Sequence, residues 1–230
     1  MKAILLAAGL GTRLRPITDA VPKCLVPIFG RPLLDIWLER LSKSGIGPFL
    51  INTHYLADRV VEYLSDSHYR SQVTLVHEPV LLGTAGTLRQ NVDFFDGQDG
   101  MLVHADNYCL ADFSQFLRAH TSRPANCMMT MMTFYTDNPA SCGIVETDSQ
   151  GIVRGFHEKT SAPPGNIANG AIYILDGRML QQISNSDFSD FSTEIIPRYI
   201  GKIFTYQCPN VLEDIGTLGV YEKYVVKNDL

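Results

Sequence analysis

Glycine and cationic residues gather near the start of this 230-residue chain. A short apolar run at residues 3–6 has the character of a buried strand, and the loop after it contains Gly9, Gly11, Thr12 and Arg13. Glycines let backbone N–H groups approach an anion closely, and an arginine beside them neutralises its charge. Lys23 adds a further cation, so the segment predicts a site for a triphosphate rather than for a neutral metabolite.

Two familiar phosphate-binding motifs do not fit this loop. The alternative to phosphate binding is that the glycines form only a tight turn. A P-loop ends its glycine run in Gly-Lys-Ser/Thr, whereas here Gly11 is followed by Thr12 and Arg13. The dinucleotide fingerprint needs a third glycine where Leu14 stands. A Gly-x-Gly after a strand is common, so the glycines alone leave phosphate binding and a simple turn equally open.

Two aspartates could hold a divalent cation, although each has a simpler explanation. Asp106 follows an apolar run at 101–105, and a carboxylate just past a buried strand is well placed for Mg²⁺, which prefers oxygen ligands. A helix cap or a turn is the alternative reading of Asp106. Asp214 precedes Gly216 in what could be a plain turn, and nothing local in the sequence joins the two aspartates.

Several other polar residues have weak signals of their own. Glu158 and Lys159 follow a predicted strand at 153–157, but a charged pair is usually solvated surface. Asn169 by itself would be a turn residue. Histidines at 54, 77, 104 and 157 show no metal-ligand spacing, so we assign them no chemistry.

Composition restricts the classes of partner. The net charge is −5, so no general basic surface attracts nucleic acid. Five scattered cysteines without a Cys-x-x-Cys pair argue against a disulfide framework or a zinc site. No apolar stretch approaches the ~20 residues of a membrane span, and the start has the pattern of a strand rather than a leader. We therefore expect a cytoplasmic protein without membrane contact.

The elements that would position these residues alternate between strands and helices up to about residue 125. Predicted strands cover 3–6, 49–51, 73–76 and 101–105, and predicted helices cover 32–44, 57–64 and 87–92, with a loop at 82–86. Alternation of this kind predicts an α/β fold with a mostly parallel sheet covered by helices on both faces. Later strands are expected at 127–133, 142–146, 153–157 and 171–175, and later helices at 192–199 and 217–226.

The first loop resembles the signature of the sugar-1-phosphate nucleotidylyltransferases. That signature is leucine, two small residues, Gly-x-Gly-Thr-Arg-Leu and then a Pro-Lys pair about ten residues later. Here the corresponding residues are the run from Leu6 to Leu14 and the pair Pro22-Lys23. The resemblance implies the Rossmann-like fold of that family in a single domain, 1–230. Residues 1–125 would form a nucleotide-binding half, and 126–230 a sugar-binding half with a small lid-like portion.

The resemblance also implies roles for individual residues. The nucleotide would be bound by Leu6, Ala8, Gly9, Gly11, Thr12, Arg13, Lys23, Glu78, Gly83, Thr84 and Ala85. The metal, Mg²⁺, would be held by Asp106 and Asp214. The sugar phosphate would be bound by Gly143, Glu158, Lys159 and Asn169. Catalysis would rest on Arg13, Lys23 and Asp106. Four departures from the family pattern are Ala105, Thr160, Leu212 and the order Gly170-Ala171.

The base-binding segment favours a guanylyltransferase within this family. Glu78-Pro79 followed by 83–86 resembles the loop of enzymes acting on mannose or manno-heptose 1-phosphate, and Glu78 or loop carbonyls could accept the two donors of guanine. The expected partners are therefore GTP and a manno-configured sugar 1-phosphate, with in-line displacement at the α-phosphorus; self-association is left open. A uridylyl- or thymidylyltransferase, a non-catalytic regulatory subunit and a dinucleotide-dependent oxidoreductase are the alternatives.

Overall fold

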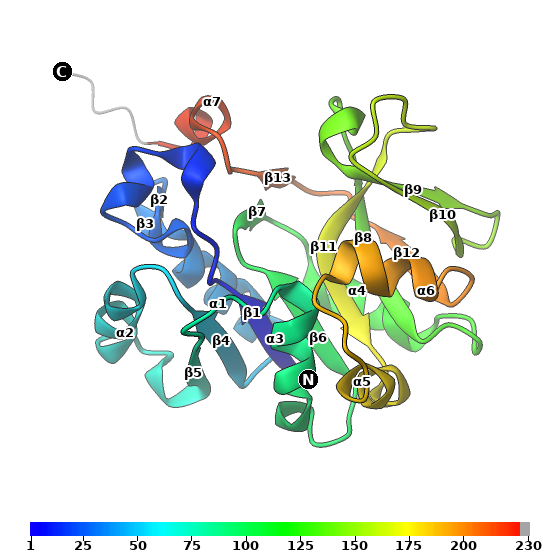
Figure 1. The fold of residues 1–230 in the computed structure, drawn as a ribbon, viewed down its shortest axis with the longest axis horizontal. Helices are drawn as coiled ribbons and strands as arrows, with labels where there is room; N and C mark the ends of the chain where they lie inside the picture. The colour runs from blue at the N-terminus through cyan, green and yellow to red at the C-terminus, as the bar shows by residue number, and fades with distance from the viewer. Residues whose placement is uncertain (226–230) are drawn as a thin grey trace.

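The computed structural model describes residues 1–225, and a mixed sheet of nine strands forms its centre (Figure 1). The strands of the sheet are β1 (Lys2–Leu6), β4 (Phe49–Thr53), β5 (Val73–His77), β6 (Gly100–His104), β8 (Met129–Tyr135), β9 (Gly143–Thr147), β10 (Val153–Glu158), β11 (Ile167–Leu175) and β12 (Ile203–Gln207). Their main order is β10-β9-β11-β6-β1-β4-β5, with β8 beside β11 and β12 beside β8. Residues from both predicted halves therefore contribute to one continuous sheet.

Two short ladders lie outside this sheet. One pairs β2 (Pro27–Ile28) with β3 (Arg31–Pro32), and the other pairs β7 (Asn107–Cys109) with β13 (Leu212–Asp214). The second ladder joins segments about one hundred residues apart, immediately beside the two aspartates singled out above.

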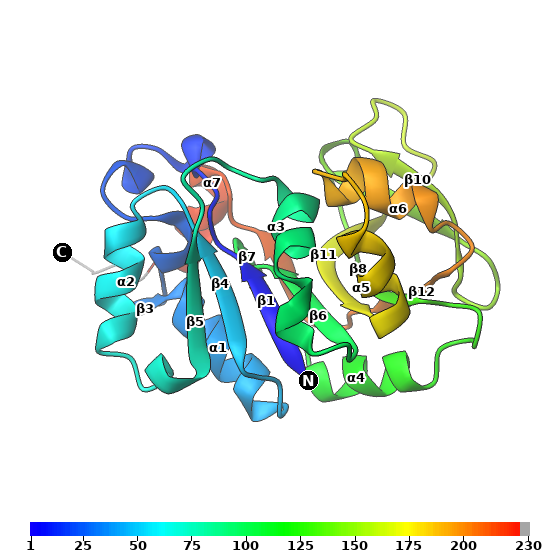
Figure 2. The same cartoon turned by 60° about the horizontal axis from the view of Figure 1, so that its bottom comes forward.

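Helices cover both faces of the sheet, as predicted (Figure 2). In the described part of the chain they are α1 (Leu33–Lys43), α2 (Ala57–Ser65), α3 (Thr84–Gln90), α4 (Phe113–Thr121), α5 (Gly177–Ser184), α6 (Ile196–Arg198) and α7 (Leu218–Tyr221). Successive side chains of a strand point to opposite faces. Accordingly Ala3 and Leu5 pack in one core with α1, α2 and α4, whereas Ile4 packs in a second core with α3 and α5.

Strand pairing is parallel in the first half of the chain and mainly antiparallel after about residue 125, where the strand–helix alternation of the sequence ends. β1 pairs in parallel with β4 and β6, and β4 with β5, as βαβ alternation requires. β11 then runs antiparallel to β6, β8 and β9, which adds the second half to the edge of the parallel part. The expected α/β class with a mostly parallel, mixed sheet is confirmed.

The observed elements depart from expectation in a few places. The helix predicted at 87–92 begins three residues earlier, so 84–86 are its first turn and not a loop. The sequence argument did not identify α4, α5, β12 or the β7–β13 ladder. The last predicted helix, 217–226, is α7 followed by a 3₁₀ turn at Glu222–Tyr224, and Val226 lies outside the described residues.

The C-terminal segment returns to the first half of the chain (Figure 1). The Tyr221 hydroxyl donates to the Pro27 carbonyl at 3.0 Å, and the Phe29 amide donates to the Tyr224 carbonyl at 2.7 Å. These bonds close the fold by holding the segment after β13 against the β2–β3 ladder. Among residues 1–225, none of the helices combines the length and hydropathy needed to cross a bilayer.

A buried histidine, His120, makes the stability of the fold depend on pH. His120 of α4 is 3% exposed; its Nδ1 lies 2.8 Å from the Thr130 hydroxyl and its Nε2 lies 3.2 Å from Asp99 Oδ2. Burial, together with the nearby Arg123 charge, lowers the pKa of His120 from 6.5 to about 4, although Asp99 acts in the opposite direction. The ring is therefore neutral in the folded protein near pH 7.

We expect His120 to destabilise the fold as the medium is acidified. Its folded pKa of about 4 lies below its unfolded value, so the unfolded chain binds more protons between pH 4 and 6.5. The stability contribution is complete above pH 6.5 and falls by up to about 3 kcal/mol on approaching pH 4. Urea unfolding from pH 7.5 to 4 should show this slope, and His120→Asn should show a shallower one. Parallel pH profiles would contradict the assignment.

Candidate functional site

The carboxyl ends of three adjacent parallel strands meet at the centre of the candidate site. The register places Leu6 at the end of β1 opposite Asn52 of β4 on one side and His104 of β6 on the other. In α/β sheets this edge is where ligands bind, because the loops leaving the strands open there. The glycine loop leaves β1 at the same edge, so sheet topology alone brings it to Asn52 and His104.

A cavity of about 240 Å³ lies at this edge. It is lined by Leu6, Ala7, Ala8, Gly9, Lys23, Cys24, Asn52, Glu78, Leu81, Gly83, Thr84, Thr87, His104 and Asp106. Most residues predicted to bind the nucleotide are therefore brought together here. Gly11, Thr12, Arg13 and Ala85 do not line this cavity.

Hydrogen bonds inside the cavity wall hold the glycine loop in place. Asn52 Oδ1 accepts from the Ala7 amide at 2.8 Å, and Asn52 Nδ2 donates to Glu78 Oε1 at 2.9 Å. Thr87 also donates to Glu78 Oε1, and the Leu82 amide donates to Oε2. Glu78 is only 2% exposed, so its carboxylate acts first as an anchor for the surrounding backbone.

Helix α3 begins where a glycine allows a close approach to the second half of the chain. Gly83 has φ +78°, and a Cβ there would lie 2.3 Å from the Ser189 carbonyl oxygen. That carbonyl accepts from the amides of Ala85 and Gly86, the first free donors of the helix. The segment begins a helix at Thr84 because this distant carbonyl satisfies those amides, which no local sequence pattern reveals.

Lys23 joins the two aspartates. Its Nζ lies 3.0 Å from Asp106 Oδ2 and 3.3 Å from Asp214 Oδ1. Arg13 completes the cluster, with one guanidinium nitrogen 3.1 Å from Asp214 Oδ2. The β7–β13 ladder explains the meeting, since its register sets Asp214 opposite Asn107 and so beside Asp106.

The electrostatics of this cluster favour the ionised form of Asp106. Removal of water from the Asp106 carboxyl acts to raise its pKa, but the Lys23 ammonium together with other neighbouring groups outweighs that effect, and the pKa lies below its usual value. A Cβ at Gly216 would lie 2.7 Å from Asp214 Oδ1 and 2.8 Å from an Arg13 nitrogen, so a side chain there would displace these charged groups. The Gly216 amide instead donates to Asp214 at 2.8 Å.

Asp106 and Asp214 supply oxygen ligands of the kind that Mg²⁺ prefers. Residues 1–225 contain no cluster of three or more His, Cys, Asp or Glu side chains suited to a metal. Two carboxylates beside a loop that is predicted to bind phosphate nevertheless match Mg²⁺, which keeps several waters and takes further oxygens from bound phosphates. The residues at Asp106 and Asp214 fit such an ion when it arrives with a nucleotide.

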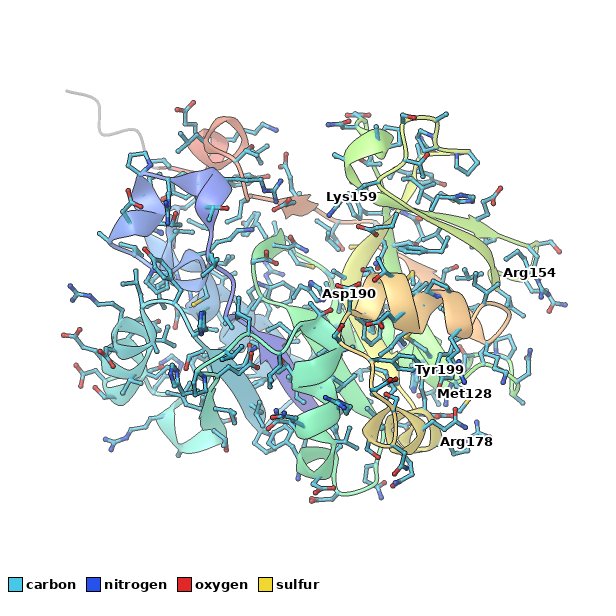
Figure 3. All side chains as sticks on the ribbon, viewed as in Figure 1. Met128, Arg154, Lys159, Arg178, Asp190 and Tyr199 are labelled. Carbon is cyan, nitrogen blue, oxygen red and sulfur yellow. The ribbon has the colours of Figure 1, made fainter. Side chains whose placement is uncertain are left out.

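The predicted sugar residues form a second group on β9, β10 and β11. Gly143 pairs with Glu158, and a Cβ at Gly143 would lie 2.7 Å from Glu158 Oε2. Lys159 has φ +47°, a conformation unusual for a side-chain-bearing residue and often found at functional sites. In the view of Figure 3, Lys159 and Asp190 lie along the margin of the second half that faces the first, whereas Arg154 and Arg178 project from its outer edge.

The inverted small pair after Asn169 has a structural basis. A Cβ at Gly170 would lie 2.8 Å from a Leu212 methyl group and 2.9 Å from the Met132 carbonyl oxygen, so this position requires glycine. Ala171 adopts φ +55°, and its amide donates to Asn169 Oδ1 at 3.0 Å. Asn169 Nδ2 donates to the Tyr173 hydroxyl at 2.7 Å, so the amide is held within β11.

Comparison with known proteins agrees with this geometry. The sequence profile described as Nucleotidyl transferase matches residues 2–227. The chain belongs to the nucleotidyl transferase family.

Individual relatives of this nucleotidyl transferase chain differ in the reaction that their names give. A mannose-1-phosphate guanylyltransferase from Mycobacterium tuberculosis is 30% identical over 94% of the chain, and a UTP–glucose-1-phosphate uridylyltransferase from Synechocystis is 26% identical over 96%. The chain spans 61% of the length of each. HddC from Yersinia pseudotuberculosis has the same fold, with a TM-score of 0.82, 24% identity and 97% coverage of both chains.

Sequence reasoning missed three polar residues of the cavity wall, which are Asn52, Thr87 and His104. Asn52 and His104 lie at strand ends, a position that alone could have marked them, but their residue types suggested no chemistry. Thr87 was placed in a helix without a role, and only its contact with Glu78 reveals one. In this nucleotidyl transferase, a position at the carboxyl end of a parallel strand was therefore more informative than residue type.

We expect Asn52→Ala to destabilise the protein by about 2–4 kcal/mol, because the buried Glu78 carboxylate and the Ala7 amide would both lose a partner. Urea unfolding at pH 7.5 measures the change. Asn126→Ala is the matched control, since Asn126 is exposed and makes one long bond, so its effect should stay within about 0.5 kcal/mol. Equal shifts in the two variants would count against a structural role for Asn52.

Proposed function

We propose that this chain transfers GMP from GTP to the phosphate of a manno-configured sugar 1-phosphate, giving a GDP-sugar and pyrophosphate. The observation that carries the proposal is the meeting of Arg13, Lys23, Asp106 and Asp214 beside a cavity lined by the glycine loop. A non-catalytic regulatory subunit would have no need for this complete set of charges.

The nucleotide would occupy the cavity between two groups of residues. Backbone amides of the loop after β1, together with Gly11, Thr12 and Arg13, would face the phosphates. Gly83, Thr84 and Ala85 at the start of α3 would contact the base. Glu78 anchors that segment through the Leu82 amide, so we propose that it shapes the base site as well as any direct contact it makes.

The sugar 1-phosphate would approach from the second half of the chain. Lys159 is well exposed, and its ion pair with the neighbouring Glu158, at 3.3 Å, lies at the surface, so its Nζ could also bind a phosphate. Glu158 and Asn169 would face the sugar hydroxyls, and Gly143 keeps space open beside Glu158. The strained backbone of Lys159 is consistent with a residue retained for binding.

The chemistry needs positioning more than proton transfer. An oxygen of the sugar phosphate attacks the α-phosphorus, the bond from that phosphorus to the bridging oxygen breaks, and pyrophosphate leaves with the electron pair. The attacking phosphate is already anionic near neutral pH, so the chain has only to align two polyanions and neutralise the developing charge. Arg13 would act on the leaving pyrophosphate and Lys23 on the α-phosphate.

Mg²⁺ fits the same arrangement. Asp106 and Asp214 would hold it, and when bound it would neutralise phosphate charge at the reacting centre. Lys23 Nζ bridges both carboxylates and so reduces their mutual repulsion.

We expect Arg13→Ala to lower kcat/KM by about 10²–10³-fold, as for the loss of one preorganised charge contact at a transition state. Folding should be unaffected, because the Arg13–Asp214 ion pair is exposed and such pairs contribute little stability. Pyrophosphate release and thermal melting are the two measurements. Arg118→Ala on the exposed face of α4 is the matched control and should keep full activity. Near-wild-type rates in Arg13→Ala would remove it from the mechanism.

The test of the whole proposal is pyrophosphate release with each nucleoside triphosphate and a panel of sugar 1-phosphates. We expect GTP to exceed dTTP and UTP by at least about tenfold, since a buried acceptor left unpaired costs ~1–3 kcal/mol. Mannose or manno-heptose 1-phosphate should be the best acceptor. If pyrophosphate release is fastest with UTP or dTTP and glucose 1-phosphate, the proposed substrates are wrong and the proposed type of reaction is still correct. Binding without turnover for every pair would instead support a regulatory subunit.

A further inference from the structure

One polar atom in the wall of the nucleotide cavity is without a hydrogen-bond partner. Within residues 1–225, the buried side-chain atoms that lack a partner are Ser42 Oγ, Arg89 Nε, His104 Nε2 and Gln207 Nε2. Of these residues only His104 lines the cavity. Buried polar groups in proteins are nearly always hydrogen-bonded, so an exception within a binding cavity calls for a ligand.

His104 lies where the nucleotide cavity meets the predicted sugar residues. On one side it is registered against Leu6 at the start of the glycine loop. On the other side its ring is edge-on to the ring of Tyr173, with centroids 6.4 Å apart and planes at 73°. The Tyr173 hydroxyl is in turn bound by Asn169, a residue of the predicted sugar group. Charges acting on the His104 ring come from Asp106, Asp190, Lys23 and Glu158.

One side of the His104 ring is apolar. Tyr173 lies edge-on to this ring, and Phe191 stacks in turn on Tyr173 with ring centroids 4.4 Å apart. A leucine in this place would bury no unpaired nitrogen and would avoid the penalty that His104 carries. The histidine therefore makes physical sense as a residue that gains its partner when substrate binds.

We propose that His104 Nε2 forms a hydrogen bond with a ring hydroxyl of the sugar 1-phosphate and thereby helps to select the sugar. A neutral imidazole nitrogen either donates or accepts according to its tautomer, and a hydroxyl can complement both, whereas a phosphate oxygen only accepts. Tyr173 packs against the ring and is itself bound by Asn169 of the predicted sugar group, which favours a sugar hydroxyl over a ribose hydroxyl of the nucleotide. The assignment rests on the function proposed above.

The experiment compares His104→Leu, which keeps the volume of the ring, with His104→Asn, which restores a polar atom near the same place. His104→Leu should raise KM for the sugar 1-phosphate about tenfold, the effect of one lost hydrogen bond, and leave the GTP dissociation constant unchanged. His104→Asn should recover part of the loss. His68→Ala, a histidine stacked on Tyr69 outside the site, is the matched control and should behave as wild type.

Deoxygenated substrates identify the group that His104 contacts. The test uses a series of sugar 1-phosphates that each lack one hydroxyl. For one member of the series, wild type and His104→Leu should have the same KM. If dGTP abolishes the difference instead, the contact is with the ribose and the proposal is overturned; an unchanged sugar KM overturns it as well. Melting curves verify folding, and His104→Ala replaces the leucine variant if that one does not fold. Wild-type protein without turnover would refute the proposed function first, and this inference with it.

Discussion

The lysine ammonium between two carboxylates is the interaction on which the site depends. The side chain of Lys23 is only 7% exposed, and a buried ammonium is strongly unfavourable unless anions surround it. Its two anions come from residues 106 and 214, so the chain must bring both segments to one place. The β7–β13 ladder does this through backbone pairing, and Arg13 and Gly216 then close around Asp214.

A second set of buried polar contacts fixes the opposite wall of the cavity. Glu78 accepts from the side chains of Asn52 and Thr87 and from the Leu82 amide, and Asn52 reaches the Ala7 amide of the glycine loop. A fully satisfied buried network of this kind specifies one arrangement, because every alternative leaves a polar group unpaired. The loop expected to bind phosphate is thus held by the strands beside it rather than by its own glycines.

A backbone contact also joins the first half of the chain, 1–125, to the second half, 126–230. The Ser189 carbonyl caps the first amides of α3, and Gly83 makes room for it. This contact ties the segment proposed to bind the base to the segment that precedes α6. His104 lies between the same halves, with Leu6 on one side and Tyr173 on the other. Contacts of this type join the segments proposed to bind the nucleotide to those proposed to bind the sugar.

Local patterns were sufficient for the elements that depend on burial. The apolar runs of β1, β4, β5 and β6 and the amphipathic stripe of α1 are properties of a few neighbouring residues, and the structure has them within one or two residues of expectation. The segment 84–86 was misjudged because a carbonyl one hundred residues away satisfies the helix amides there. Helices α4 and α5 begin at Asp112 and Asp176, whose side chains cap them, a signal that was present in the sequence and not used.

The amino-acid sequence by itself determined the α/β class and, through its resemblance to known enzymes, the family; it also predicts that the first loop binds an anion. Those properties reside in short motifs and in periodic burial, which need no knowledge of distant contacts. Only the tertiary structure decided that Asp106, Asp214 and Lys23 meet, that Glu78 is enclosed, and that His104 has a buried nitrogen without a partner. Each of these depends on the register of paired strands, and strand pairing between distant segments is set by the packing of the whole chain.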